Sequence, residues 1–189
     1  MIDFMIFQKL NQNYSEGFSI MEIIVVIFII SLGLVGVLSL IMQNIRVEQV
    51  NKNMLIASQL AQEGLELVRN KRDTNWLNGD DWETGDGANP DTDIIQDGDY
   101  AIDYTGQILD VDDIEDPDAK LYEVAGNFLR HYIAPPDDSS FTGFFRMITA
   151  DTDTSNASTT FQCLVQWENR GTTYQYMTET VLYDWLSAS

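Results

Sequence analysis

The chain has 189 residues, of which 30 are acidic and 10 are Lys or Arg, so its formal net charge at pH 7 is −20. A protein this acidic repels phosphate backbones, which argues against direct binding of nucleic acid through charge neutralisation. Its single cysteine excludes an intramolecular disulfide, and one histidine with one cysteine does not supply the roughly four clustered ligands that zinc needs.

An apolar run occupies residues 18–42 and contains one charged residue, Glu22. As a helix rising about 1.5 Å per residue it is about 37 Å long, which exceeds the roughly 30 Å hydrocarbon core of a bilayer. It is also longer than the apolar segment of a cleaved signal peptide, so we expect a membrane-spanning helix. Because a carboxylate in lipid costs several kcal/mol unless it finds a partner, Glu22 is a functional candidate.

The residues before the run suggest that partner. A cut after Gly17 would give Phe18 a free α-ammonium one helical turn before Glu22, on the same helix face. The sequence GFSIME at residues 17–22, followed by the apolar run, resembles the cleavage and methylation motif of type IV prepilins and type II secretion pseudopilins. The resemblance implies that residues 1–17 are a leader peptide cut off after Gly17, that Phe18 is N-methylated, and that Glu22 acts in assembly.

The same resemblance implies partners and a location for the chain. The partners are homologous pilin subunits, a prepilin peptidase and an inner-membrane assembly platform. The chain would cross the cytoplasmic membrane once and then enter an extracytoplasmic filament. The stretch LAQEGLELVRNKRDTNW at residues 60–76 is similar to minor, modification-type prepilins. Major pilin, minor pilin and pseudopilin all stay open, as do roles in adhesion, motility, DNA uptake and secretion.

A second interpretation treats the apolar run as a plain signal anchor, with Glu22 an incidental charge that reaches the lipid headgroups. The chain is then a bitopic membrane-anchored protein whose acidic extracytoplasmic head binds calcium or an extracellular partner. The charges that flank the run do not decide its orientation, because Lys9 is opposed by acidic residues in the same leader and basic residues also follow the run.

Residues 43–76 predict an amphipathic helix that continues the apolar one. Apolar and small residues recur at alternating spacings of three and four, which forms one helical stripe. These residues are Val47, Val50, Met54, Ala57, Ala61, Gly64 and Val68. The small ones would let another element pack closely, and Asn78-Gly79 is a stop signal.

Residues 77–189 predict an acidic head rich in β-strands, with 4 basic and 23 acidic residues and hence a net charge of 4 − 23 = −19. Alternating apolar residues indicate strands at 100–104, 128–133 and 144–149. An antiparallel hairpin is predicted from 161–167 and 172–183 around a turn at 168–171. The expected fold class is therefore α+β, a long N-terminal helix packed on a C-terminal antiparallel sheet.

Two acidic stretches raise the question of a calcium site, because calcium takes six to eight oxygen ligands. The candidate ligands are Asp91, Asp93, Asp97, Asp99, Asp110 and Asp112. Neither stretch has the spacing of an EF-hand loop, so solvated loops are the favoured interpretation and no cofactor is expected.

No residues with an evident catalytic arrangement occur in the sequence. His131 and Cys163 each fall in a predicted strand without companions, and nucleophilic catalysis needs a base beside the nucleophile. We therefore expect no enzyme activity. The aromatic residues of the C-terminal hairpin predict core strands, with an exposed filament surface as the alternative. They are Trp167, Tyr174, Tyr176, Tyr183 and Trp185.

Overall fold

The computed structural model describes residues 17–85, 97–124, 127–132, 139–155 and 157–184. The chain divides into two compact units, Met1–Val47 and Glu48–Ser189, and each is considered by itself. One long helix, α1 (Ile20–Asn78), contributes to both units, and all the described strands belong to the second.

In the first unit, α1 begins with a hydrogen bond from the Ile23 N–H to the Ser19 carbonyl. Its side chains are uncovered all round, with Phe18 79% exposed just before the helix and Ile41 46% exposed within it. The Ser31 hydroxyl donates to the Ile27 carbonyl within the helix, which satisfies a polar group in an apolar segment. The helix is long and apolar enough to cross a membrane, with a mean hydropathy of 3.0 in its most apolar part. The predicted apolar helix is therefore confirmed as a candidate span.

The end of α1 agrees with the predicted stop signal. Gly79 has φ +84°, a conformation that a residue with a side chain rarely adopts. Its N–H donates to the Trp76 carbonyl at 3.1 Å, and the Asp80 N–H donates to the Asn75 carbonyl at 3.0 Å. These two bonds form a Schellman motif, which satisfies carbonyls that the helix leaves without an internal partner.

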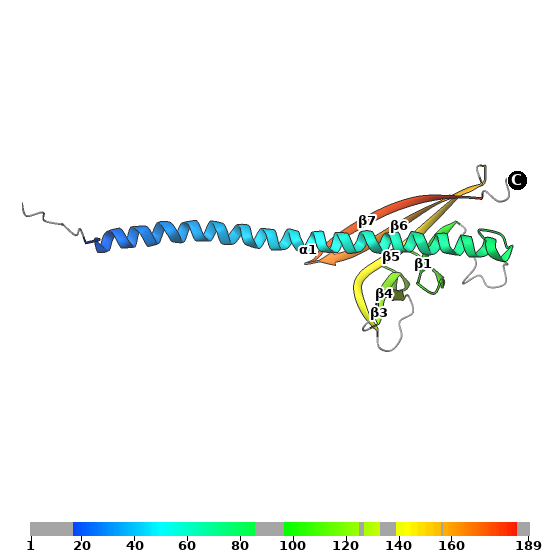
Figure 1. The fold of residues 1–189 in the computed structure, drawn as a ribbon, viewed down its shortest axis with the longest axis horizontal. Coiled ribbons are helices and arrows are strands. Elements are labelled where there is room, and N and C mark those ends of the chain that lie inside the picture. The colour runs from blue at the N-terminus through cyan, green and yellow to red at the C-terminus, as the bar shows by residue number, and fades with distance from the viewer. Residues whose placement is uncertain (1–16, 86–96, 125–126, 133–138, 156, 185–189) are drawn as a thin grey trace, which may run out of the picture. The chain divides into compact units, whose positions relative to one another are not determined.

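The described strands form one antiparallel sheet around a long central strand (Figure 1). The strands are β1 (Gly98–Ile102), β2 (Ile108–Asp110), β3 (Lys120–Val124), β4 (Asn127–Tyr132), β5 (Ser139–Asp153), β6 (Ser158–Asn169) and β7 (Thr172–Tyr183). One edge of β5 pairs with β3 near its start and with β1 near its end, while its other edge pairs with β6. The outer neighbours are β4 beside β3, β2 beside β1 and β7 beside β6.

The predicted C-terminal antiparallel hairpin is confirmed, and its first strand is longer at both ends than the predicted 161–167. β6 and β7 pair in continuous register from Asn169 opposite Thr172 to Ser158 opposite Tyr183. The loop is only Arg170 and Gly171, both with positive φ, +54° and +76°. Such a two-residue loop is a type I′ turn, whose twist matches the twist of paired strands.

Two strands were not expected from the sequence. β2 and β3 flank the acidic stretch from Asp110 to Asp118 that was interpreted as a solvated loop, and β2 includes its first residue. A short 3-10 turn, η1 (Pro117–Ala119), lies just before β3. Both strands are short, and they form because β2 pairs with β1 and β3 pairs with β5. Their own sequences are therefore weak predictors of strand structure.

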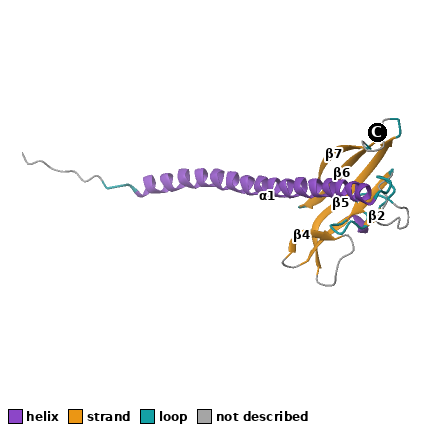
Figure 2. Cartoon of the chain, turned by 45° about the vertical axis from the view of Figure 1, so that its right-hand side comes forward, coloured by secondary structure: helices purple, strands orange, loops and turns teal. Residues whose placement is uncertain are grey.

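The main core lies between one face of the sheet and the second part of α1 (Figure 2). The helix buries the predicted stripe residues Ala57, Ala61, Gly64 and Val68, together with Leu60 and Leu65. The strands contribute Phe144, Ile148, Phe161, Cys163, Val165 and Trp167. At the start of the stripe, Val47 and Met54 are exposed. The predicted α+β architecture, with the helix packed on an antiparallel sheet, is confirmed.

Candidate functional site: the apolar helix and the acidic head

Glu22 lies in the first turn of α1, where a negative charge interacts favourably with the helix dipole. Its side chain is exposed, and no ion-pair partner for it occurs in the described part of the chain. Gly17 and Phe18 precede the helix, which begins at Ile20. Phe18 therefore lies outside the helix that contains Glu22. Its backbone nitrogen is in the peptide bond to Gly17 and carries no charge.

The surface around Glu22 is apolar and uncovered on every side of the helix. Exposed Ile, Val, Leu and Phe side chains follow one another from Ile20 to Ile45. A patch of this extent is rare on a soluble monomer and marks contact with lipid or with other apolar surfaces. The helix is hydrophobic all round and has no single apolar stripe, which is typical of a membrane span or of a helix buried among others.

In the second unit, one buried arginine joins α1 to the sheet. Arg146 of β5 is 1% exposed. Its guanidinium donates to the Leu60 carbonyl at 3.1 Å and to the Ile102 carbonyl at 2.7 Å, and lies 3.2 Å from the Glu63 carboxylate. A buried charge is tolerated only when it is paired and hydrogen-bonded in this way. Sequence reasoning did not identify Arg146, although its place between the buried Phe144 and Ile148 of an alternating strand was a signal.

The contact between helix and sheet is closest at Gly64. A Cβ atom at this position would lie 2.9 Å from the Cys163 sulfur and 3.1 Å from Cδ of Arg146. The absence of a side chain thus lets α1 approach β5 and β6, as the small-residue stripe predicted. Cys163 is fully buried, and burial raises the pKa of its thiol to about 12, partly offset by the nearby Arg146 charge. The thiol is therefore a packing group with little thiolate at neutral pH.

The calcium candidates are only partly within the described residues. Asp91 and Asp93 lie outside them. Asp97 accepts a hydrogen bond from the Thr152 N–H at 2.5 Å, and Asp99 accepts one from the Thr149 hydroxyl at 2.5 Å. Asp110 lies in β2 opposite Tyr100, and the Asp112 N–H donates to Asp116 at 3.4 Å. Within the described ranges, no group of three or more His, Cys, Asp or Glu side chains is placed to hold a metal.

These carboxylates affect a neighbouring tyrosine instead. The pKa of Tyr100 is raised to about 12, first by burial and then by the charges of Asp110, Asp97 and Asp99. The phenol thus stays protonated across the physiological range.

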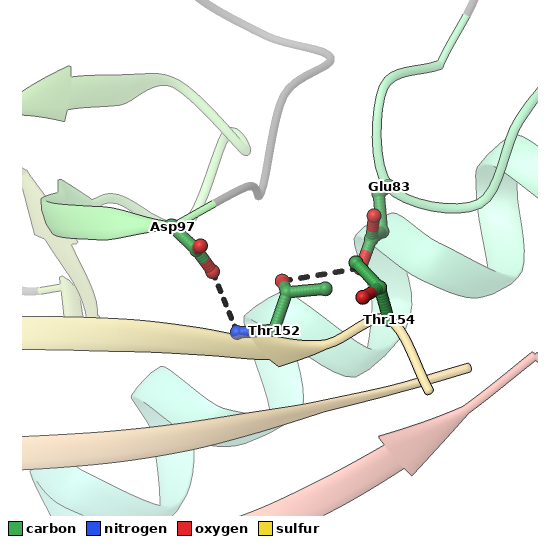
Figure 3. A pocket seen from close by; sticks show the side chains of 4 residues that line it. All are labelled: Glu83, Asp97, Thr152 and Thr154. Atoms are coloured by element: carbon green, nitrogen blue, oxygen red, sulfur yellow. Dashed lines mark hydrogen bonds between the residues drawn. The ribbon is translucent and has the colours of Figure 1, made fainter. Parts of the chain in front are cut away.

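A hollow of about 310 Å³ lies beside Asp97 and is lined by Glu83, Thr152 and Thr154 (Figure 3). Glu83 accepts hydrogen bonds from the hydroxyls of Thr152 at 3.3 Å and Thr159 at 2.5 Å. The carboxylates of Glu83 and Asp97 therefore both accept hydrogen bonds from the protein. The bonds of Glu83 connect the segment after α1 to the end of β5 and the start of β6.

The remaining predicted residues divide between core and surface. Trp167 is buried and stacks on Tyr174 with ring centroids 5.6 Å apart, and Tyr176 packs against the same core. The core prediction is wrong for Tyr183, which is 55% exposed because it lies on the opposite face of β7. Trp185 lies outside the described residues. His131 is described only by its backbone, which pairs with that of Glu123.

Comparisons with known proteins find no matching family model, curated protein or solved structure.

Proposed function

We propose that this chain is a structural subunit of a type IV pilus-like or type II secretion pseudopilus filament. The observation that carries the proposal is the exposed apolar surface of α1, which has Glu22 as its one charge between Phe18 and Met42 and follows directly after Gly17. This surface requires a covering of lipid or of other helices. Before assembly the covering is the cytoplasmic membrane, and afterwards it is the apolar helices of homologous pilin subunits.

Cleavage after Gly17 creates the charge that Glu22 needs. A prepilin peptidase converts the peptide nitrogen of Phe18 into an α-ammonium, which keeps its positive charge after N-methylation. When an incoming helix replaces lipid around its neighbour, the carboxylate of one subunit and the ammonium of the other meet. Neither charge then remains unpaired in an apolar surrounding, where either one alone is costly.

The role of the head is structural in this proposal, not enzymatic. Its net charge of 4 − 23 = −19 beyond Trp76 makes it a poor partner for nucleic acid, so DNA uptake by this subunit directly is not proposed. The inner-membrane assembly platform is the further partner, and the similarity of residues 60–76 to minor, modification-type prepilins favours a low-abundance subunit of an extracytoplasmic filament.

Removal of the Glu22 carboxylate tests the pairing. Glu22→Ala and Glu22→Gln should leave membrane insertion unchanged, because both make the helix more apolar. Incorporation into filaments should fall by about tenfold or more, the factor that corresponds to losing about 1.4 kcal/mol of subunit interaction. Glu48→Ala is the matched control, since Glu48 is an exposed carboxylate of the same helix beyond the apolar run. Normal incorporation of both Glu22 variants would contradict the pairing.

Mass spectrometry of the mature N-terminus tests the processing separately. The proposal expects a chain that begins at methylated Phe18. An intact Met1 would instead support the bitopic anchor, and a calcium-dependent rise in melting temperature that a chelator reverses would then indicate a calcium-binding head.

A further inference from the structure

Another hollow in the described part of the head, of about 330 Å³, has no role in the proposed function. Its lining includes side chains from four strands and from the segment before η1, which are Glu115, Lys120, Phe145, Gln166, Glu168 and Thr173. Lys120, Phe145 and Gln166 form one row across β3, β5 and β6, because they are paired in register. The core side chains of β6 are odd-numbered and face α1, so Gln166 and Glu168 lie on the opposite face of the sheet.

A bulge in β5 opens this hollow. The register between β3 and β5 shifts between Lys120 and Tyr122, and Gly143 in the same part of β5 has φ +88°. A glycine in this conformation is typical of a bulge, which bends its strand and can end its pairing. β6 pairs with β5 only from Phe144 onwards, opposite Trp167, and the first part of β5 curves away from β6 and β7 (Figure 1). The hollow therefore lies where two neighbouring strands separate.

The charged groups around the hollow have opposite signs and are not paired with one another. The Lys120 ammonium lies 6.0 Å from the centre of the Phe141 ring, and no described carboxylate is within ion-pair distance of it. Glu115 and Glu168 nevertheless line the same hollow. The Glu168 carboxylate accepts a hydrogen bond from the Gly171 N–H at 3.1 Å, which leaves further lone pairs for a ligand. The hollow thus offers one ammonium donor and two carboxylate acceptors.

A buried amide lies among these charges. Gln166 is 7% exposed, and its Oε1 accepts a hydrogen bond from Nε2 of Gln175 at 2.8 Å. Its own Nε2 lies 3.5 Å from the Glu115 carboxylate, which is longer than an ordinary hydrogen bond. Because an amide nitrogen carries two hydrogens, Gln166 retains a donor for a ligand in the hollow.

Aromatic rings provide the apolar part of the hollow. Phe145 is half-buried, because it packs against the small cluster of Ala101, Val111 and Ala119 while it also lines the hollow. Phe141 is 44% exposed and meets Phe145 edge to face, with ring centroids 5.4 Å apart. The face of an aromatic ring is negative and attracts polarised C–H groups. Such groups cover one face of many sugar rings.

We infer that this hollow binds a neutral sugar of one or two units, with a C–H face of the sugar on Phe145. Sugar hydroxyls donate to carboxylates and accept from ammonium and amide groups, so one neutral molecule satisfies charges of both signs. An anion would meet two carboxylates in an acidic head, and a cation would meet Lys120. The volume is near the lower end of the range for ligand pockets, about 300–1,000 Å³, which limits the size of the sugar.

Saturation-transfer difference NMR on the full-length chain tests the inference. The detergent must lack a sugar headgroup, as dodecylphosphocholine does. The probes are glucose, galactose, mannose, N-acetylglucosamine, cellobiose and lactose, with glucuronate and the zwitterionic dipeptide glycyl-leucine as charged comparisons. At least one neutral sugar should bind saturably with a dissociation constant of about 1–10 mM, and its C–H groups should receive the strongest signal.

Variants of the lining locate the binding site. Lys120→Met and Glu168→Gln should each weaken binding by about tenfold, because each removes a charged hydrogen-bonding group. Phe145→Leu should also weaken it, since leucine keeps an apolar contact with the small cluster but lacks the ring. Glu179→Gln is the matched control, because Glu179 is an exposed carboxylate of β7 that does not line the hollow. Urea unfolding verifies that each variant is folded.

Three results would overturn the inference. The first is the absence of saturable binding by every neutral sugar. The second is binding that Lys120→Met and Glu168→Gln leave unchanged. The third is binding of only glucuronate or only the dipeptide, which would assign the hollow to a charged ligand. The inference uses only contacts within the head, so its outcome is independent of cleavage after Gly17 and of filament incorporation.

Discussion

Gly64→Ala adds one methyl group at the point where α1 is closest to the sheet. The new Cβ would lie 2.9 Å from the Cys163 sulfur, 3.1 Å from Cδ of Arg146 and 3.4 Å from Cδ1 of Ile148. The first distance is below any ordinary contact, and the atoms that must move belong to a packed core. Overpacking of this kind costs about 1–3 kcal/mol.

The substitution also has a favourable effect, since alanine is about 1 kcal/mol better than glycine inside a helix. The two effects oppose each other, and the expected net result is a loss of up to about 2 kcal/mol in the free energy of unfolding of the head. Because the sulfur makes the closest contact, the loss should shrink or change sign in a Cys163→Ala background, where that atom is absent.

Urea unfolding of the full-length chain in detergent, followed by tryptophan fluorescence, measures all four members of this cycle. Trp167 is a suitable probe because it is buried in the same core. Gly33→Ala is the matched control, since it adds the same methyl group to the same helix where no atom lies within 4 Å. Equal destabilisation by Gly64→Ala with and without the Cys163 sulfur would refute the reasoning.

Two further predictions concern the same core. Arg146→Met should reduce the stability of the head by about 3–5 kcal/mol in the same urea assay, because it removes the buried hydrogen bonds to the Leu60 and Ile102 carbonyls and the ion pair with Glu63. Arg170→Met in the exposed turn should change it by less than about 0.5 kcal/mol. Burial raises the pKa of the Cys163 thiol from 9.0 to about 12, so the folded state keeps a proton that the unfolded state loses in this range. The free energy of unfolding should therefore fall as pH rises from about 9 to 12, and Cys163→Ala should flatten that fall between about pH 9 and 10, before the phenol of Tyr100 contributes.

The sequence alone was sufficient for the features that local interactions dictate. The apolar run of residues 18–42 was recognisable as a helix because almost every position in it is apolar. Gly79 ended α1 where its positive φ was needed, and the alternating residues of β6 and β7 with Arg170-Gly171 between them specified a hairpin. In each case the signal and the structure lie within a few residues of each other, so no distant contact could override them.

Only the tertiary structure decided the features that depend on distant parts of the chain. β2 and β3 exist because β1 and β5 offer them hydrogen bonds, and their own acidic surroundings suggest loops. Arg146 is buried because carbonyls from α1 and β1 converge on it. Local pattern fixes which element forms, but pairing and burial depend on which elements meet.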